Sequence, residues 1–379
     1  MQKIGIICEY NPFHNGHIYH IEKIKEKFPD SFITLVLSTC FTQRGEISLL
    51  TKWEKTKLAL KYKVDLVIEL PFFYTTQSAD VFASASVKLL EELKMDYLIF
   101  GSESNDIESL KNVTRTILYH KEYDNLVKKY LDSGNNYPSS MARALYHLTG
   151  IKLNTSNDLL GISYIKAIFW NEYQIKPLTI KRTNNYLNTK LTNDISSATS
   201  IRKALFENKD IEKYVPKETF ELIKNKKDCL DNYFYLLKYK LINEINELDK
   251  YLDVSEGIDK RIKKIITKVN SYEELLDKIK TKRYTYNRLN RMFLHILFNI
   301  SKDFKPDINY IRVLGFNQKG KLYLKNLKKE INLPIVTNYK DTDDQVLKLE
   351  LKITLLYLQI TKQEHLINEE LKSVPVNLL

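Results

Sequence analysis

Continuous apolar runs alternate with helical patterns along the first hundred residues. The runs are rich in β-branched residues, as is typical of strands buried on both faces: KIGIICEY (3–10), FITLVLS (32–38), VDLVIELP (64–71) and MDYLIFGS (95–102). Helical periodicity fills the segments between them, at 16–27, 51–62 and 78–94. The alternation predicts an α/β fold with a Rossmann-like, doubly wound parallel sheet, whose ligand lies at the carboxyl ends of the strands.

The rest of the chain is mostly helical. Helical patterns follow at about 106–132, 137–148 and 157–170, before a strand KPLTIKR that ends at Arg182 and a loop rich in Asn and Thr. Later segments at 218–245 and 288–300 are strongly helical, while NYIRVLGFN (309–317) and LPIVTNY (333–339) could be short strands. Because 379 residues exceed the usual size of one core, we expect two domains, an α/β domain at 1–205 and a mainly helical domain at 206–379.

Composition favours a protein of the reducing cytoplasm. The three cysteines, Cys8, Cys40 and Cys229, form no C-x-x-C pair, so neither a disulfide framework nor a thiolate zinc site is indicated. The sequence shows no secretory signal and no apolar run near the roughly 18 residues that a membrane span needs. It also indicates no stable protein partner.

The net charge of +12 is concentrated in the second half of the chain. Residues 1–150 hold equal numbers of basic and acidic side chains, and residues 260–329 alone carry 19 basic against 5 acidic ones, with tyrosines and phenylalanines between them. Such a tract attracts polyanions. Solvated helix faces in a lysine-rich protein would give the same excess, so the charge alone leaves both interpretations open.

Three histidines, His14, His17 and His20, follow the first strand within seven positions. They could share a metal ion, although no acidic or thiolate residue stands at a matching short spacing. They could instead be structural and cap a helix. A phosphate site is the more economical interpretation, because the turn after the first parallel strand directs helix N–H groups towards an anion, and Gly16 allows close approach. Imidazole N–H groups would then stabilise the charge that develops during adenylyl transfer.

The string His14-Asn15-Gly16-His17 resembles the H-x-G-H signature of the nucleotidyltransferase superfamily, which includes the class I aminoacyl-tRNA synthetases. The longer string EYNPFHNGHIYH resembles one family more closely, the bacterial tRNA(Met) cytidine acetate ligases. Further matches are spread over most of the chain: FTQRGE (41–46), VDLVIELPF (64–72), FGSES (100–104), SNDLLGISYIKA (156–167), IKR (180–182), ISSATSIRKAL (195–205) and YIRVLGFN (310–317). The chain departs from the family's usual pattern at Thr39-Cys40, Ile47 and Lys55.

The resemblance implies an AMP-forming ligase with a nucleotidyltransferase-type fold. Acetate would react with ATP to give acetyl-adenylate and pyrophosphate, and the acetyl group would pass to the wobble cytidine of elongator tRNA(Met), giving N4-acetylcytidine. Mg²⁺ would be carried by the nucleotide, with no metal site in the protein. Adenylation makes acetate an electrophile that the weakly nucleophilic cytosine amine can attack.

The resemblance also implies an ATP site and catalytic residues. His14, His17 and Arg202 would be catalytic, with Asn11 and Pro12 shaping the turn. The ATP site would comprise Ile7, Cys8, Glu9, Tyr10, Asn11, Pro12, Phe13, His14, Asn15, Gly16, His17, His20, Gly101, Asn157, Arg182, Ser196, Ser197, Thr199 and Ser200. The Ser/Thr group precedes a helix and could equally be an ordinary N-cap, as could Asn157. Gln43, Arg44 and Glu46 follow the second strand and could hold acetate or cytidine.

The basic tract gains a partner under this interpretation. Its arginines would contact phosphates and its tyrosines would stack on unpaired anticodon-loop bases: Arg283, Tyr284, Tyr286, Arg288, Arg291 and Arg312. Two other functions remain open from the sequence. A small-molecule adenylyl- or cytidylyltransferase would explain the first domain but not residues 206–379. An RNA-binding protein on an inactive nucleotidyltransferase fold would not need both phosphate motifs.

Overall fold

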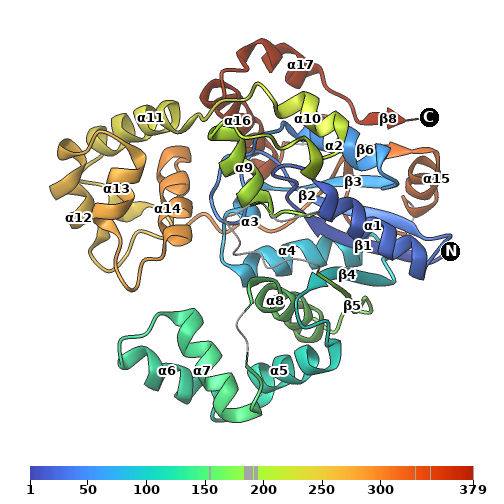
Figure 1. Ribbon diagram of the computed structural model, residues 1–379, viewed down its shortest axis with the longest axis horizontal. Coiled ribbons are helices and arrows are strands. Elements are labelled where there is room, and N and C mark those ends of the chain that lie inside the picture. Colours follow the sequence, from blue (N-terminus) through green and yellow to red (C-terminus); the bar gives the residue numbers. More distant parts are fainter. Residues whose placement is uncertain (153–154, 183–190, 192–194, 329, 342, 379) are drawn as a thin grey trace.

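The protein is described by a computed structural model that covers residues 1–152, 155–182, 191, 195–328, 330–341 and 343–378 (Figure 1). Its strands are β1 (Lys3–Cys8), β2 (Phe32–Ser38), β3 (Leu66–Leu70), β4 (Tyr97–Ser102), β5 (Lys176–Lys181), β6 (Ile311–Asn317), β7 (Ile335–Val336) and β8 (Val376–Leu378). The Asn- and Thr-rich loop expected after Arg182 lies mostly outside the described residues.

The helices of the first half lie between and after the parallel strands. They are α1 (Asn15–Lys27), α2 (Lys52–Lys61), α3 (Phe72–Thr75), α4 (Ala79–Glu92), α5 (Ile107–Tyr119), α6 (Tyr123–Asp132), α7 (Tyr137–Thr149), α8 (Ser156–Trp170) and α9 (Ala198–Phe206). Those of the second half are α10 (Lys217–Ile223), α11 (Leu230–Asn243), α12 (Ile258–Ile265), α13 (Tyr272–Ile279), α14 (Tyr286–Phe298), α15 (Gln318–Leu327), α16 (Gln345–Ile360) and α17 (Ile367–Lys372).

The predicted parallel sheet is confirmed for the first five strands. The sheet order is β5-β4-β1-β2-β3-β6-β7, and β1 to β5 pair with one another in parallel. From β1 the chain proceeds through β2 to β3 on one side and returns to β4 and β5 on the other. The strand order therefore reverses between β1 and β4, where doubly wound sheets bind their ligands at the carboxyl ends.

The sheet continues beyond the boundary predicted at residue 205. β6 pairs antiparallel with β3, and β7 and β8 both pair parallel with β6. An antiparallel strand at the edge of an otherwise parallel sheet is common, because such a strand needs no crossover helix. Residues 206–379 are therefore not wholly a separate helical unit. The division stays a prediction for the helices α11 to α14, while residues from 311 onward complete the first sheet.

Two helical lobes project from the sheet in Figure 1: α11 to α14 lie at the left, and α5 to α7 lie at the bottom. Two long helices predicted from the sequence are each interrupted. The segment 106–132 forms α5 and α6, and the segment 218–245 forms α10 and α11. The second break holds the polar run KNKKD (224–228), which offers no apolar side chain to pack on the core.

The hydrophobic core lies on both faces of the sheet, as expected for strands covered by crossover helices. All seven residues of β2 and all five of β3 are buried. Among the described residues, none of the helices combines the length and apolar character required to cross a bilayer.

Candidate active site

The H-x-G-H segment forms the turn between β1 and α1. His14 is the N-cap of α1, and its Nδ1 accepts a hydrogen bond from the backbone N–H of Gly16 at 3.0 Å. The Nδ1 of His17 accepts one from the backbone N–H of His14 at 3.1 Å. The two imidazoles stack with their centroids 3.9 Å apart. Both histidines therefore cap α1, and each uses one of its two ring nitrogens to do so.

These two hydrogen bonds fix the tautomers of the rings. A neutral imidazole carries one proton, and a nitrogen that accepts a hydrogen bond cannot carry it. His14 and His17 must each hold their proton on Nε2 when they are neutral. Each ring then presents an N–H donor, as a phosphate site requires, and the capping and phosphate interpretations are compatible.

Burial keeps the three histidines neutral, because it lowers their pKa values. Burial, with help from the nearby guanidinium of Arg182, lowers the pKa of His14 to about 3 and that of His20 to about 4. Burial, with help from His14 and Arg182, also holds the pKa of His17 well below its usual value. Neutral N–H donors can therefore approach a polyanion without first losing a charge.

The lowered pKa values predict that acid weakens the fold. The unfolded chain protonates its histidines near about pH 6.5, whereas folded His20 resists protonation down to about pH 4. In that window the unfolded state binds more protons, so the free energy of unfolding falls as the pH falls, by about 1.4 kcal/mol per pH unit for each such histidine. Urea denaturation at pH 7 and pH 5.5 measures the loss. The His20→Gln protein should lose less between these pH values, and an equal loss would contradict the assignment.

Gly16 is required by the closeness of this turn. A Cβ added at Gly16 would lie 2.8 Å from Cε1 of His14 and 3.2 Å from Cγ2 of Ile195. The second contact is with the segment that leads into α9, so the two predicted phosphate loops meet at Gly16. Ser197 is the N-cap of α9 and accepts a hydrogen bond from the backbone N–H of Ser200 at 3.1 Å.

Arg202 connects α9 with two loops at this edge of the sheet. Its Nη1 donates to the backbone oxygen of Asn11 at 2.6 Å, and its Nη2 donates to Glu46 at 2.6 Å. The side chain of Asn11 extends the connection, because it donates to the backbone oxygen of Ile47 and accepts from the backbone N–H of Leu49. Arg202 thus positions the turn at the end of β1, and its predicted catalytic contact with phosphate stays a prediction.

The carboxyl end of β4 carries the second half of the predicted site. A Cβ added at Gly101 would lie 3.1 Å from Cγ of Arg182, so these two residues are adjacent. Asn157, at the start of α8, donates through Nδ2 to Oε1 of Glu103 at 2.5 Å. The same carboxylate oxygen lies 3.9 Å from Nε of Arg182. The structure therefore brings together the three residues predicted from FGSES, SNDLLG and IKR.

Sequence reasoning missed Glu103, which holds Asn157 and faces Arg182. The sequence feature that could have identified it is its position directly after a buried strand, within the string FGSES (100–104). Reasoning also missed Asp158, which anchors the same loop by accepting from Ser102 Oγ at 2.5 Å, from the backbone N–H of Ser104 and from Thr155 Oγ1. Both carboxylates therefore organise the loop after β4.

The loop after β2 packs against the turn after β1 and against α14. The backbone N–H of Gln43 donates to Glu9 Oε1 at 2.6 Å, and its side chain donates to the backbone oxygen of Gln77 at 2.8 Å. Gly45 has a φ of 77°, and a Cβ there would lie 2.8 Å from the backbone nitrogen of Arg291. The lobe of α11 to α14 therefore meets the sheet at the predicted site.

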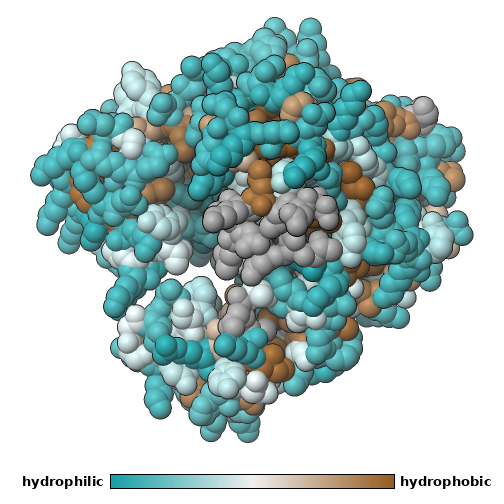
Figure 2. Space-filling view, in the orientation of Figure 1, coloured by the Kyte–Doolittle hydropathy of each residue, from teal (hydrophilic) through white to brown (hydrophobic). Residues whose placement is uncertain are grey.

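The predicted RNA-contacting residues divide into exposed and buried ones. The side chain of Arg283 is 72% exposed and Tyr286 is 44% exposed, while Arg288 and Arg291 are partly buried. This lobe presents a largely hydrophilic surface in Figure 2. Tyr284 is wrong as a base-stacking residue because it is only 2% exposed. One face of its ring is covered by Arg288, 4.0 Å away, and its hydroxyl donates to Ser255.

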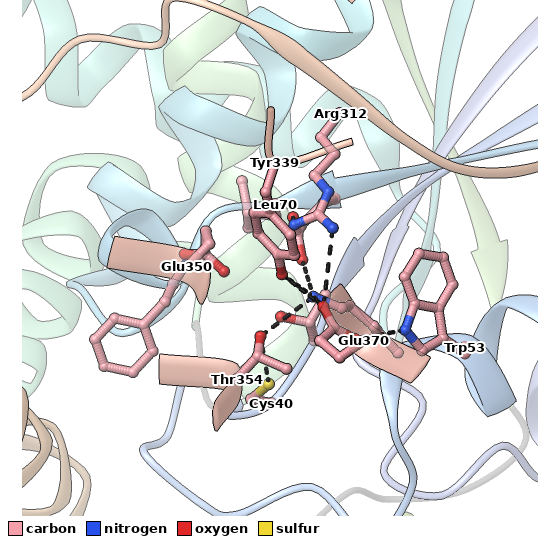
Figure 3. A network of polar contacts seen from close by, with 12 residues as sticks. Cys40, Trp53, Leu70, Arg312, Tyr339, Glu350, Thr354 and Glu370 are labelled. Carbon is pink, nitrogen blue, oxygen red and sulfur yellow. Dashed lines mark hydrogen bonds and ion pairs between the residues drawn. The ribbon is translucent and has the colours of Figure 1, made fainter. Parts of the chain in front are cut away.

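Arg312 is also wrong as an RNA contact, because it lies in the interior at 1% exposure. Its Nη1 donates to Glu69 at 3.0 Å, and its guanidinium lies 3.8 Å from the ring centroid of Tyr339. Figure 3 shows it beside Tyr339 and above Glu370, whose carboxylate also pairs with Lys52 at 2.7 Å. This buried network connects α2 and β3 with β6 and α17.

No cluster of three or more His, Cys, Asp or Glu side chains suited to a metal ion occurs within the described part of the chain.

Comparison with known proteins agrees with this geometry. A family model described as HIGH Nucleotidyl Transferase matches residues 1–372. A protein of Anoxybacillus flavithermus named tRNA(Met) cytidine acetate ligase is 38% identical over 381 residues, 95% of each chain. A Thermoanaerobacter protein of the same name is 41% identical over 353 residues, 88% of each chain.

Solved structures give the same result. The apo crystal structure of Thermotoga maritima TmcAL superposes with a TM-score of 0.91 at 31% identity and covers 100% of both chains. A second crystal form of that protein, bound with alpha-thio ATP, gives a TM-score of 0.87 at 30% identity, again over 100% of both chains.

Proposed function

The chain belongs to the HIGH nucleotidyltransferases and, among them, to the tRNA(Met) cytidine acetate ligase family, and from this premise we propose how its site works. It is an ATP-dependent ligase that converts acetate and ATP to acetyl-adenylate and pyrophosphate. It then transfers the acetyl group to the wobble cytidine of elongator tRNA(Met), giving N4-acetylcytidine.

The observation that supports this chemistry best is the pair of fixed tautomers. In the first step an acetate oxygen attacks the α-phosphorus, and pyrophosphate leaves with the bonding electrons. Negative charge grows on the phosphate oxygens as this happens. The Nε2–H groups of His14 and His17 would donate to those oxygens, and the positive end of the α1 dipole would add to the stabilisation. Because hydrogen bonds hold both rings in place, the donors need little reorganisation during the reaction.

The remaining ATP contacts would come from the ends of β4 and β5 and from the start of α9. Gly101, Asn157 and Arg182 lie together there, and Ser197 and Ser200 lie where Ile195 meets the first loop. Mg²⁺ would enter with the triphosphate, whose oxygens are ligands that this ion prefers.

The decisive experiment combines the protein with ATP, labelled acetate and bulk tRNA, followed by nucleoside analysis of the RNA. Label recovered in N4-acetylcytidine is the expected result. Unlabelled RNA together with AMP attached to a small metabolite would contradict the proposal and favour a small-molecule nucleotidyltransferase. RNA binding without any turnover would favour a protein that has lost its activity.

Glu103 provides a test of the ATP site that is independent of the histidines. Glu103→Gln keeps the shape of the side chain but removes the charge that holds Asn157 and faces Arg182. A charge-assisted hydrogen bond of this kind contributes roughly 1.5–3 kcal/mol, so the KM for ATP should rise about tenfold or more. Acetate-dependent ATP–pyrophosphate exchange at varied ATP concentration measures it. The matched variant is Glu108→Gln, whose side chain is 72% exposed on α5, and an equal rise in KM for both would contradict the assignment.

The exposed part of the basic lobe is proposed to bind the anticodon arm. Arg283 and Tyr286 are accessible, and the lobe meets the loop that carries Gln43 near the active site. An anticodon loop is single-stranded, so its wobble base can leave the stack at low cost and reach the pocket.

Arg283 is expected to act as a phosphate contact. Binding through phosphates releases counterions, so Arg283→Ala should weaken tRNA binding and lower the slope of log Kd against log salt by about one. Titration at several salt concentrations measures both quantities. Lys23→Ala, on α1 and away from this lobe, serves as the control and should leave the slope unchanged. An unaltered slope for Arg283→Ala would remove this residue from the RNA surface.

A cytoplasmic location also remains a proposal. It is supported by the three free cysteines. It is also supported by the tRNA substrate, which is found where translation takes place.

A further inference from the structure

The proposed function requires a proton acceptor that has not been assigned. When the N4 amine of cytidine attacks the acetyl carbon, its nitrogen gains positive character and must lose a proton. Cytosine N4 is a poor nucleophile because its lone pair is delocalised into the ring. A positioned base that removes the proton during the attack accelerates such a step by typically about 10²–10⁴-fold.

The two catalytic histidines cannot serve as this base. Nδ1 of His14 accepts the N–H of Gly16, and Nδ1 of His17 accepts the N–H of His14. Nε2 of each neutral ring already holds a proton. A second proton would give an imidazolium in a buried site that disfavours the charge, and it would break a hydrogen bond of the helix cap.

Two nearby carboxylates are also committed elsewhere. Glu46 accepts a hydrogen bond from Arg202 at 2.6 Å, and Glu103 accepts one from Asn157 at 2.5 Å. Protonating either of them would weaken the contacts that position the loops of the site.

Glu9 differs from these groups. It directly follows the last residue of β1 and precedes the turn that carries His14, so it stands at the carboxyl edge where the strand order reverses. Its Oε1 accepts the backbone N–H of Gln43 at 2.6 Å, which fixes the orientation of the carboxylate. Within the described residues, Oε2 accepts no hydrogen bond. The side chain is partly buried, so this second oxygen is oriented and available.

The charged and titratable groups around Glu9 come from three elements. Arg44 and Glu46 lie on the loop after β2, Lys55 on α2 and Tyr164 on α8. Burial, with help from Glu46, raises the pKa of Glu9 above its ordinary value, while the N–H of Gln43 and the cations Lys55 and Arg44 oppose the rise. A carboxylate whose pKa lies closer to neutrality is a better proton acceptor at physiological pH.

We propose that Glu9 is the base of the acetyl-transfer step, an inference that rests on the proposed function. The N4 lone pair forms a bond to the acetyl carbon, and the bond from that carbon to the phosphoryl oxygen breaks. AMP leaves with the electron pair, and the N4 proton passes to Oε2 of Glu9. Solvent takes up this proton after the products leave. Glu9 therefore acts in the second half-reaction, after the histidines have served in the first.

The test measures the two half-reactions separately in Glu9→Gln. Glutamine keeps an oxygen that can accept the N–H of Gln43 but cannot take a proton at neutral pH. Acetate-dependent ATP–pyrophosphate exchange reports the first step. Mixing the preformed acetyl-adenylate complex with an elongator tRNA(Met) transcript in a single turnover reports the second. The ratio of transfer rate to exchange rate should fall about 100-fold or more, and Glu9→Asp should recover part of it.

A ratio of transfer rate to exchange rate within threefold of the wild-type ratio would overturn the proposal, as would an equal fall in both rates.

The pH profile of the wild type provides a second readout. Its single-turnover transfer rate should rise tenfold per pH unit and then level off, and this limb should be absent from Glu9→Gln. A flat wild-type profile would also overturn the assignment. If the wild type forms no N4-acetylcytidine, the proposed function itself fails. If the wild type forms this product and Glu9→Gln has the same ratio of transfer rate to exchange rate, only the role of Glu9 is removed.

Discussion

His17→Ala is expected to slow acetate-dependent ATP–pyrophosphate exchange by about 10²–10³-fold. The variant loses the Nε2–H that is proposed to donate to the phosphate oxygens, and removing one preorganised donor from a site of developing charge has an effect of that size. It also loses the Nδ1 that accepts the N–H of His14, so α1 should be weakened by about 1 kcal/mol. Initial rates of label exchange between pyrophosphate and ATP measure the catalytic effect.

Two controls separate the loss of the donor from the loss of the helix cap. Thermal unfolding of His17→Ala should show a folded protein of slightly lower stability. Lys23→Ala lies further along α1, outside both the cap and the site, and should leave the exchange rate unchanged. Full exchange activity in a folded His17→Ala protein would contradict the role assigned to this imidazole.

Arg312→Met is expected to lower the free energy of unfolding by about 3 kcal/mol. The replacement fills much of the same space but leaves the buried carboxylate of Glu69 without its guanidinium partner. Lys52, 3.5 Å from the same carboxylate, compensates only in part, because it also pairs with Glu370. Urea denaturation measures the change, and the m-value should remain that of the wild type.

A double variant shows whether this loss arises from the unpaired charge. Glu69→Gln combined with Arg312→Met removes both members of the pair, so it should be less destabilised than the sum of the two single variants. The salt dependence of tRNA binding should be unchanged in Arg312→Met, because the residue is buried. A stable Arg312→Met protein with a reduced salt slope would restore the arginine to the RNA surface.

The sequence was sufficient to predict the first half of the fold and to propose a nucleotide site. Alternating apolar runs and helical periods are local features, and they placed β1 to β5 within a few residues of their observed bounds. His14 and His17 could be proposed from the residues alone, because their chemistry depends on spacing within one turn. Gly101, Asn157 and Arg182 could be proposed only by resemblance, since no local pattern indicates that β4, α8 and β5 meet at one edge.

The remaining features depend on contacts between distant segments. Arg312 lies in a basic tract, and only its partner Glu69, 243 positions away, reveals that it is buried. Tyr284 was expected to be exposed for the same reason, although its hydroxyl reaches the backbone of Ser255. The antiparallel direction of β6 depends on the path of the helices before it. Glu103 and Glu9 are ordinary acidic residues in the sequence, and their importance follows from what they contact.

The return of the late strands to the sheet has a consequence for synthesis on the ribosome. When only the first 205 residues have emerged, β3 is an unpaired sheet edge, Glu69 lacks Arg312, and Lys52 lacks Glu370. Exposed edges of this kind can pair with other chains. We therefore expect chaperones to bind the emerging α/β segment until residues 311–378 have been synthesised. Completion of the catalytic sheet therefore waits for the last part of the chain, and truncated products should aggregate rather than accumulate as a working activation module.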